Sequence, residues 1–413
     1  MPVLRNIGYL ARCLPEGGQG EVHPIRGAAL AWQGDRIAWA GAEADLPAEY
    51  AGWPAEDAGA RLVIPGLVDC HTHLAFGGWR GDEFELRILG RSYQEIAASG
   101  GGILSTMART RGLDAGALLA RCRGFLREMA SLGVTTVECK SGYGLDEVTE
   151  LRLLDVYRSL GREGPQRIVP TLLAAHVVPP EFRERRDEYV ALVVDRIIPA
   201  AAGMAAFCDV FVEEGAFTVA EARRILQAGL AHGLRPKLHA DQLSAGGGAE
   251  LAAEVGAASA DHLECITPEG AAALCRAGVV AVSLPLATLY LRQAPMPARA
   301  LIDAGVAVAV ATDFNPGSAP SYHLPLAMLL ACTLQRMTPA EVLKGATLLA
   351  ARAIGVEPQC GSICPGKAAD FAVIDAPDLN HWMYHFRPNA CVRTVMAGRT
   401  VWNAPAPAGP NPR

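Results

Sequence analysis

The sequence predicts an α/β protein: a (β/α)₈ TIM-like barrel with a small β-sandwich domain built from both termini. Three observations predict this fold. Apolar strand-like runs alternate with helical stretches through the middle of the chain, short β-rich runs separated by turns occupy both ends, and polar residues follow several of the central strands. We expect residues 1–64 and 360–413 to form the composite β-sandwich domain and residues 65–359 to form the barrel.

The two ends of the chain carry short runs that are rich in β-forming residues. They are Ala28–Gln33, Arg36–Ala40 and Arg61–Ile64 near the N-terminus, and Asp370–Asp375, Val392–Ala397 and Arg399–Asn403 near the C-terminus. Gly366 and Gly398 mark turns between the later runs. Neither end has enough strands to close a core alone, so we expect one small β-domain made from both.

The middle of the chain reads as eight strands with helices between most of them. The strand candidates are Val63–Cys70, Val134–Cys139, Ile168–Ala174, Asp209–Glu213, Pro236–Leu238, Ala258–Asp261, Val279–Leu284 and Val306–Ala311. Helical patterns include Ala115–Leu132, Glu147–Leu160, Ala220–His232 and Pro268–Arg276. Continuous apolar strands are typical of a parallel sheet covered on both faces, and eight such units indicate a (β/α)₈ barrel.

Composition and charge narrow the function classes. Of the 413 residues 51% are hydrophobic, which is enough for a large core, and a net charge of −6 gives no reason to expect nucleic acid or an anionic membrane as partner. The eleven cysteines include no C-x-x-C pair and indicate reduced thiols. The N-terminus lacks a secretory signal, and the most apolar run, Ala277–Leu291, is broken by Pro285. We expect a soluble cytoplasmic protein.

Histidines gather where the predicted strands end. His71 and His73 close the first strand, and in an extended strand side chains two residues apart point to the same face. The others are His176 after the third strand, His239 after the fifth and His262 after the sixth, with Asp313 after the eighth. In a barrel all these positions meet at one rim, which is where the chemistry of such folds takes place.

Imidazole and carboxylate groups at that rim suit a particular kind of metal. Three imidazoles and one carboxylate favour Zn²⁺ or Fe²⁺ over Mg²⁺ or Ca²⁺, which prefer oxygen ligands. Such an ion lowers the pKa of a bound water towards neutrality, and a neighbouring aspartate can pass the proton to a leaving nitrogen. This pattern predicts a hydrolase that acts on a C–N bond.

Several stretches resemble known sequences. Residues 65–73, Pro-Gly-Leu-Val-Asp-Cys-His-Thr-His, resemble the first-strand motif of the amidohydrolase superfamily. The longer stretches 76–87, 99–106, 138–145, 237–243 and 311–318 resemble the imidazolonepropionase family, and the resemblance covers nearly the whole chain. It implies hydrolysis of the C–N bond of 4-imidazolone-5-propanoate to N-formimidoyl-L-glutamate in L-histidine degradation. It also implies one metal ion per subunit, zinc or iron, held by His71, His73, His239 and Asp313.

The resemblance also implies a set of substrate-binding residues. Arg80 matches an arginine that binds the propionate, although the residues alone favour a surface arginine paired with Asp82 or Glu83. The remaining matches to substrate contacts are Tyr143, His176, Gln242, Asn315, Gly317 and Ser318.

At one position expected to take part in proton transfer, this chain differs from some members of the family. Some family members carry a glutamate where this chain has Gln242, and a neutral amide can only orient water, which leaves Asp313, assisted by His262, as the proton shuttle. Lys140 lies in a family-like stretch, and we expect of it no more than loop structure or electrostatic support. The fourth strand region offers no lysine placed like the carboxylated lysine of binuclear relatives, which favours a mononuclear site.

Two alternatives remain. One is a related amidohydrolase that acts on another cyclic amide or amidine. Such a substrate lacks the propionate, so its enzyme would not need Arg80. The other is a barrel that has become a non-catalytic binding protein, which is disfavoured because all four implied ligands are present.

The glycine-rich segments do not form a phosphate-binding motif after a strand. We expect Gly100–Gly102 and Gly246–Gly248 to form flexible rim loops. We expect a homodimer that binds a small-molecule substrate.

Overall fold

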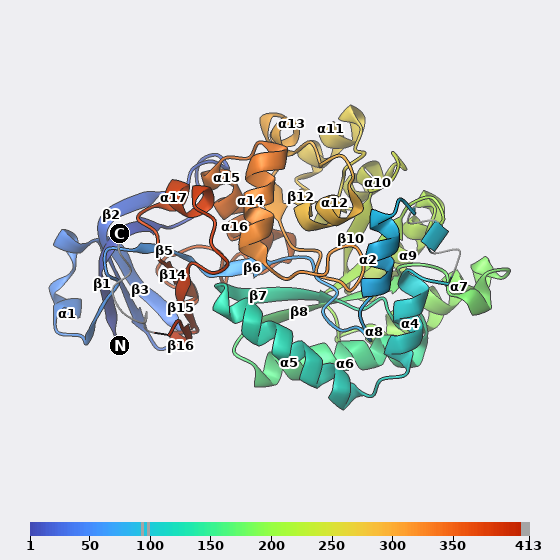
Figure 1. The fold of residues 1–413 in the computed structure, drawn as a ribbon, viewed down its shortest axis with the longest axis horizontal. Helices are drawn as coiled ribbons and strands as arrows, with labels where there is room; N and C mark the ends of the chain where they lie inside the picture. The colour runs from blue at the N-terminus through green and yellow to red at the C-terminus, as the bar shows by residue number, and fades with distance from the viewer. Residues whose placement is uncertain (92–94, 97–99, 406–413) are drawn as a thin grey trace.

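The structure is a computed structural model that describes residues 1–91, 95–96 and 100–405. Figure 1 shows two parts: a β-rich region that contains the first and last segments of the chain, and a larger barrel with helices around it. Ser99, the first residue of one family-like stretch, and the last eight residues of the predicted segment 360–413 lie outside the described residues.

The barrel is one sheet of eight strands that follow one another in chain order. All neighbours are parallel. The strands are β6 Leu67–Asp69, β7 Val134–Lys140, β8 Arg167–Ala175, β9 Phe207–Val212, β10 Arg235–Ala240, β11 Ser259–His262, β12 Val280–Ser283 and β13 Val308–Val310. Because helices cover the outer face and side chains fill the interior, most strand positions are buried. The predicted barrel is confirmed.

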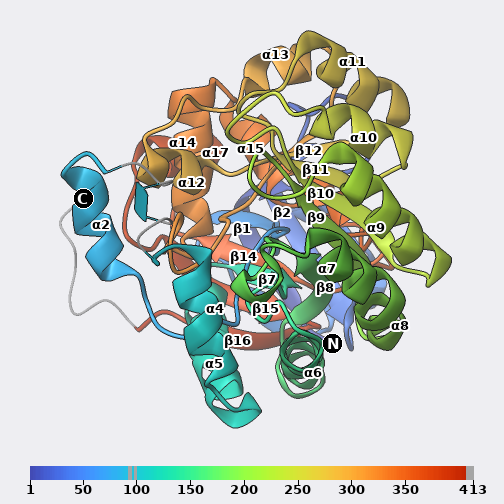
Figure 2. The same ribbon diagram turned by 90° about the vertical axis from the view of Figure 1, so that its right-hand side faces the viewer.

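Helices form a ring around these strands, as Figure 2 shows with the barrel facing the viewer. They are α2 Gly81–Ile88, α4 Ile103–Arg111, α5 Ala115–Ser131, α6 Glu147–Glu163, α7 Arg186–Leu192, α8 Ile198–Ala201, α9 Val219–Ala231, α10 Gly248–Glu254, α11 Pro268–Ala277, α12 Pro285–Leu291, α13 Ala298–Asp303, α14 Leu324–Gln335, α15 Pro339–Gly345 and α16 Leu348–Ala353. Capping side chains fix the N-termini of several helices. Asp114 and Asp146 accept hydrogen bonds from backbone N–H groups of α5 and α6, and Thr218 forms a capping box with Glu221 on α9.

The first and last barrel strands meet through hydrogen bonds at their C-terminal ends. The Asp69 carboxylate accepts hydrogen bonds from the Thr312 backbone N–H (3.1 Å) and hydroxyl (2.6 Å). Beyond it, the Asp313 N–H donates to the His71 carbonyl (3.0 Å), and the His73 N–H donates to the Phe314 carbonyl (2.8 Å). This closure brings the end of β13 directly beside the residues that follow β6.

The second sheet interleaves both ends of the chain. Its order is β16-β15-β14-β5-β1-β2-β3, with β4 beside β1. The strands are β1 Val3–Ala11, β2 Pro24–Gln33, β3 Arg36–Ala42, β4 Ala55–Asp57, β5 Leu62–Pro65, β14 Phe371–Ile374, β15 Cys391–Met396 and β16 Arg399–Asn403; short helices α1 Ala48–Ala51 and α17 Leu379–Tyr384 accompany them. β5 joins the two halves because it pairs with β1 on one side and β14 on the other.

A separate apolar core lies on this sheet and draws on both halves of the chain. Trp32 from β2 and Phe371 from β14 are buried and meet edge to face, with ring centroids 5.1 Å apart. Leu4, Ile7 and Val395 belong to the same buried cluster. The predicted composite β-domain is confirmed as a fold, while its exact boundaries stay a prediction.

The prediction of one strand over Val63–Cys70 is wrong. The run divides at Gly66 into β5 in the small sheet and β6 in the barrel. A Cβ at Gly66 would lie 2.3 Å from the Thr135 hydroxyl oxygen, so the chain can cross between the two sheets there only without a side chain. Apolar pattern does not reveal such a crossing, because both halves are equally buried.

Some elements were not predicted. β1 carries Asn6 and Gly8 inside it, and its register shifts between Leu4 and Ile7, which breaks the alternation that marks a strand. β10 runs on to Ala240, so His239 lies within the strand and does not follow it. In the described part of the chain, no helix combines the length and apolarity needed to cross a membrane.

Candidate active site

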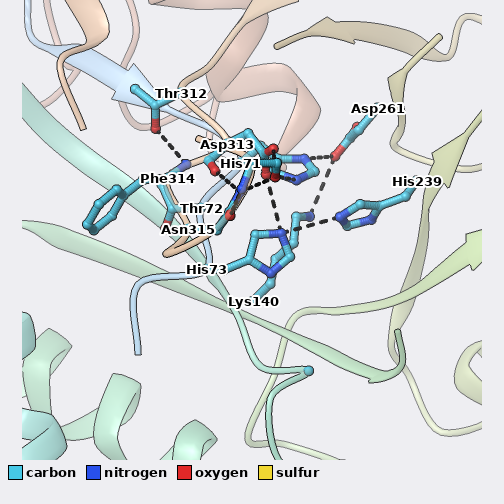
Figure 3. A network of polar contacts seen from close by, with 12 residues as sticks. His71, Thr72, His73, Lys140, His239, Asp261, Thr312, Asp313, Phe314 and Asn315 are labelled. Carbon is cyan, nitrogen blue, oxygen red and sulfur yellow. Dashed lines mark hydrogen bonds and ion pairs between the residues drawn. The ribbon is translucent and has the colours of Figure 1, made fainter. Parts of the chain in front are cut away.

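Four side chains converge at the C-terminal rim of the barrel. His71 and His73 follow β6, His239 lies near the end of β10, and Asp313 follows β13. An Asp313 carboxylate oxygen lies 3.4 Å from His71 Nε2 and 3.5 Å from His73 Nε2. His73 Nε2 lies 3.4 Å from His239 Nε2 (Figure 3). The structure therefore brings together all four residues that the sequence nominated as ligands.

The spacing of these atoms fits a tetrahedral metal ion. Zinc–ligand bonds of about 2.0–2.2 Å place neighbouring ligand atoms about 3.3–3.6 Å apart, which matches the observed separations. His71 Nε2 is buried without a hydrogen-bond partner among the described residues. Burial lowers the pKa of His73 to about 4, so its imidazole is neutral at pH 7, the form that binds a metal. The residues present fit a divalent ion with nitrogen and oxygen ligands.

Two buried carboxylates orient two of these imidazoles from behind. Asp261 Oδ2 lies 2.6 Å from His71 Nδ1, and Asp209 Oδ2 lies 3.1 Å from His239 Nδ1. Each contact engages one ring nitrogen and leaves Nε2 directed at the shared point. A carboxylate behind a ligating histidine fixes its tautomer and orientation in many metal sites.

Two lysines balance the charge of those carboxylates. Lys140 Nζ lies 2.8 Å from both Glu138 and Asp209 and 3.5 Å from Asp261, while Lys237 Nζ lies 3.5 Å from Asp261. Burial by itself would raise the pKa of Asp209, but the charges of Lys140 and His239 hold it well below its ordinary value. Of the two roles expected of Lys140, electrostatic support is the one seen here, because it neutralises the carboxylates that orient the histidines.

Sequence reasoning missed Glu138, Asp209 and Asp261. The available signal was a charged residue inside an otherwise apolar strand, since every one of them is fully buried in β7, β9 or β11. Buried charges of this kind need partners. Glu138 has a partner two residues away on β7, Lys140, but Asp209 and Asp261 are paired with residues of other segments, which the sequence could not reveal.

A cavity of about 470 Å³ opens beside the convergent site. It is lined by most of the residues predicted to contact substrate or transfer protons, namely Arg80, Tyr143, His176, Gln242, His262, Asn315 and Ser318. The wall also contains Arg87, Arg91 and Arg292, which the sequence did not indicate. The cavity is therefore rich in guanidinium groups in a chain that is acidic overall.

Arg80 lies buried in the wall of this cavity. Only 6% of the residue is exposed, and its Nε lies 3.4 Å from Glu83. The alternative prediction of a surface arginine is therefore wrong, because Arg80 is buried. Its predicted pairing with Glu83 is confirmed. Gly317 makes room for it, because a Cβ at that position would lie 1.1 Å from the Arg80 Nη2 atom.

The loop with Tyr143 is held by the carboxylate of Glu150. This side chain accepts backbone hydrogen bonds from Gly142 (2.9 Å), Gly144 (2.7 Å) and Leu145 (2.8 Å). The flanking glycines are needed locally: Gly142 has a φ of 102°, and a Cβ at Gly144 would lie 2.7 Å from the Glu150 nitrogen. Tyr143 is thereby fixed at the cavity wall.

His176 lies beside the ligand histidines. Its Nδ1 is 3.0 Å from the Gly142 carbonyl, and its ring stacks on His73 with centroids 5.2 Å apart. The carbonyl defines which ring edge faces the cavity. His176 lines the cavity, and its contact with the substrate stays a prediction.

Asn315 organises the loop after β13. Its Oδ1 accepts hydrogen bonds from the backbone N–H groups of Gly317 and Ser318, both at 2.8 Å, and its Nδ2 donates to the Asp313 carbonyl at 2.7 Å. The amide thus holds the turn that carries Asp313 and Gly317. The sequence had nominated it only as a substrate contact.

Gln242 and the glycine-rich loop after it also reach the rim. Gln242 lines the cavity and is 8% exposed. The adjacent Asp241 carboxylate accepts hydrogen bonds from the backbone N–H groups of Gly246 (2.9 Å) and Gly248 (3.1 Å). The rim loop that was expected to be flexible is therefore tied to the end of β10.

Comparison with known proteins places this chain among hydrolases of one fold. A profile of the amidohydrolase family matches residues 173–401. The imidazolonepropionase of Shouchella clausii is 45% identical over 92% of this chain and 87% of its own length. That of Myxococcus xanthus is 47% identical, with 93% and 92% covered.

Solved structures show the same fold at low sequence identity. The 5-methylcytosine deaminase from Klebsiella pneumoniae has a TM-score of 0.76 at 16% identity, covering 99% of both chains. Atrazine chlorohydrolase from Arthrobacter aurescens, solved in complex with zinc, has a TM-score of 0.73 at 16% identity and covers 97% of this chain and 95% of its own. At such identity the similarity concerns the fold alone.

Proposed function

The chain belongs to the imidazolonepropionase family of amidohydrolases, and from this premise we propose how its residues carry out the reaction. It hydrolyses the C–N bond of 4-imidazolone-5-propanoate to give N-formimidoyl-L-glutamate, a step of L-histidine degradation. One observation supports the assignment most strongly. The buried Arg80 guanidinium lines the same cavity as the convergent histidines and Asp313, so a carboxylate-binding group lies beside a candidate metal centre.

Amidohydrolases depend on metals, and the clusters at this rim could hold one. We assign one ion, zinc or iron, to His71, His73, His239 and Asp313; when bound, it supplies a hydroxide nucleophile at neutral pH by lowering the pKa of water. Affinity and availability decide the ion in the cell.

The cavity residues bind and orient the substrate. Arg80 pairs with the propionate, for which a planar guanidinium offers two parallel hydrogen bonds. Tyr143 and His176, which line the cavity, contact the imidazolone ring, and the loop with Gly317 and Ser318 completes the binding site. The side chains fix the ring carbonyl in front of the attacking water.

Proton transfer falls to Asp313, with assistance from His262. The Asp313 carboxylate accepts a proton as water attacks the ring carbonyl carbon and delivers it to the ring nitrogen as the C–N bond breaks. Gln242 is neutral, so its amide can hydrogen-bond the water or the ring but cannot act as a base.

A direct assay tests this function. Purified protein should consume imidazolonepropanoate and release formimidoylglutamate, with activity proportional to bound zinc or iron measured on the same sample. Protein that holds one equivalent of either metal yet leaves imidazolonepropanoate intact while hydrolysing another cyclic amide or amidine would establish the alternative. Metal-free protein that stays inactive after reconstitution with both metals would indicate a binding protein.

We also propose a homodimer located in the cytoplasm. All eleven cysteines are free in the structure, as expected in a reducing compartment. Light scattering after size-exclusion chromatography should give twice the mass of the 43.5 kDa chain, and a monomeric mass would contradict the dimer.

A further inference from the structure

A buried carboxyl group beside the candidate active site has no role in the reaction as described above. Glu264 Oε2 lies 3.8 Å from His262 Nδ1, and both side chains are only 3% exposed. Neither atom has a hydrogen-bond partner among the described residues. Buried polar atoms without partners are rare in folded proteins, so two such atoms facing each other indicate a pair.

The backbone around His262 is shaped to bring the two side chains together. His262 ends β11 with a φ of 83°, and Leu263 follows with a φ of 65°. Residues other than glycine rarely have a positive φ, and those that do are concentrated at functional sites. The turn is pinned to the end of β10, since the Leu263 N–H donates to Ala240 (3.0 Å) and the Cys265 N–H to Asp241 (2.8 Å).

The second oxygen of Glu264 is held from the opposite side. The Thr288 hydroxyl of α12 donates to Oε1 at 3.0 Å. Among the described residues the one ion-pair partner of Glu264 is His262, so no lysine or arginine stabilises a negative charge there. The groups that face this carboxyl are His262 from its own turn, Thr288 from α12 and the charge of Asp313 after β13.

These surroundings keep the carboxyl protonated. Burial raises the pKa of Glu264 to about 8, the negative charge of Asp313 acts in the same direction, and the Thr288 hydrogen bond opposes both. At pH 7 the carboxyl therefore carries its proton and offers an O–H donor to the unpartnered nitrogen of His262. An imidazole that accepts at Nδ1 carries its own hydrogen on Nε2.

We propose that Glu264 is the positioning residue of His262: its carboxyl donates a hydrogen bond to Nδ1 and fixes the ring with Nε2–H directed into the cavity. In that tautomer His262 donates a hydrogen bond to the lactam carbonyl oxygen, on which negative charge develops during attack. The assistance that His262 gives is this hydrogen bond: no proton is transferred at Glu264 or His262, and Asp313 carries the proton from water to nitrogen. The inference deepens the proposed function and rests on it.

A double-mutant cycle in the metal-loaded enzyme tests the pair. Glu264→Leu should lower kcat about 10–100-fold, as loss of a supporting hydrogen bond commonly does, with KM and metal content little changed. Glu264→Gln should stay within about threefold of wild type, because its amide can still donate to Nδ1. In the His262→Gln background, Glu264→Leu should cause no further loss, because the ring it positions is gone.

The matched control is Glu341→Gln, a carboxylate in the capping box of α15 outside the cavity lining, which should lower Tm alone. If Glu264→Leu does not fold, Glu264→Met enters the same cycle. Wild-type kcat in the leucine variant, an equal loss in the glutamine variant, or an undiminished loss in the His262→Gln background would each overturn the pairing. Metal-loaded wild-type enzyme that does not hydrolyse imidazolonepropanoate would instead overturn the proposed function.

Discussion

Arg80 is the residue on which substrate selection depends most directly. Its guanidinium is buried in the cavity wall, where a hydrogen bond between charged groups contributes about 1.5–3 kcal/mol. Arg80→Ala should therefore raise KM for imidazolonepropanoate about 10–100-fold with a smaller change in kcat. The control is Arg223→Ala, which removes a half-buried arginine of α9 paired with Glu254 outside the cavity lining and should leave the kinetics unchanged. Unaltered KM in Arg80→Ala would show that the propionate binds elsewhere.

Gly317 tests the same contact from the opposite wall. A methyl group at this position would overlap the Arg80 guanidinium, and the glycine does not occupy the left-handed region, so its backbone tolerates alanine. Gly317→Ala should raise KM as Arg80→Ala does while the protein stays folded. Gly124→Ala on α5, where a Cβ meets nothing within 4 Å, is the matched control for steady-state kinetics and Tm. A normal KM in Gly317→Ala would mean that Arg80 can move aside without loss.

Asp261 should affect metal binding without touching the metal. Asp261→Asn keeps the shape of the side chain but weakens its 2.6 Å contact with His71 Nδ1. Outer-shell changes of this kind typically lower metal affinity about 10–100-fold, which competition with a chelator measures. Asp303→Asn, an exposed aspartate on α13, should bind metal like wild type. Equal affinity in both variants would show that His71 is oriented by packing alone.

At the scale of elements, α6 supports the site as well as the barrel. Glu150 on its first turns holds the loop with Tyr143 through three backbone N–H groups. Glu150→Gln turns one acceptor into a donor that faces the Gly142 N–H, so the loop should shift and kcat/KM should fall about tenfold.

The same helix offers an internal control. Asp146 caps its N-terminus by accepting a hydrogen bond from Thr149 N–H at 2.8 Å. Asp146→Ala should lower the free energy of unfolding by about 1 kcal/mol, measured by urea denaturation, with normal kinetics. A similar loss of kcat/KM in Asp146→Ala and Glu150→Gln would attribute both effects to the stability of α6 and not to the loop.

At the scale of the whole molecule, the small sheet joins the two ends of the chain through β5. Removing residues 370–413 would leave β5 without β14 and expose Trp32, which packs against Phe371. We expect the truncated chain to aggregate or to lose its cooperative thermal transition, followed by circular dichroism. A truncated chain with wild-type Tm would show that the barrel is stable without the composite domain.

Helices and strands were predicted well where local sequence signals define them and missed where only tertiary contacts do. Helices α5, α6, α9 and α11 begin at or next to their predicted residues, because capping residues and periodic apolar positions are local signals. The division of Val63–Cys70 between two sheets was missed, since both parts are apolar and only the contact of Gly66 with Thr135 separates them. β1 was missed because Asn6 and Gly8 interrupt its pattern.

The sequence by itself determined the fold class through its alternating strands and helices, and its motifs carried the resemblance that implied the family and the four candidate ligands. The tertiary structure decided how those residues are supported. Asp209 and Asp261 reach His239 and His71 only because parallel strands bring distant segments to one rim, while Glu264 faces His262 because of the turn that joins them. A buried charge is stabilised by partners in space, and the histidine partners of Asp209 and Asp261 lie far from them in the sequence.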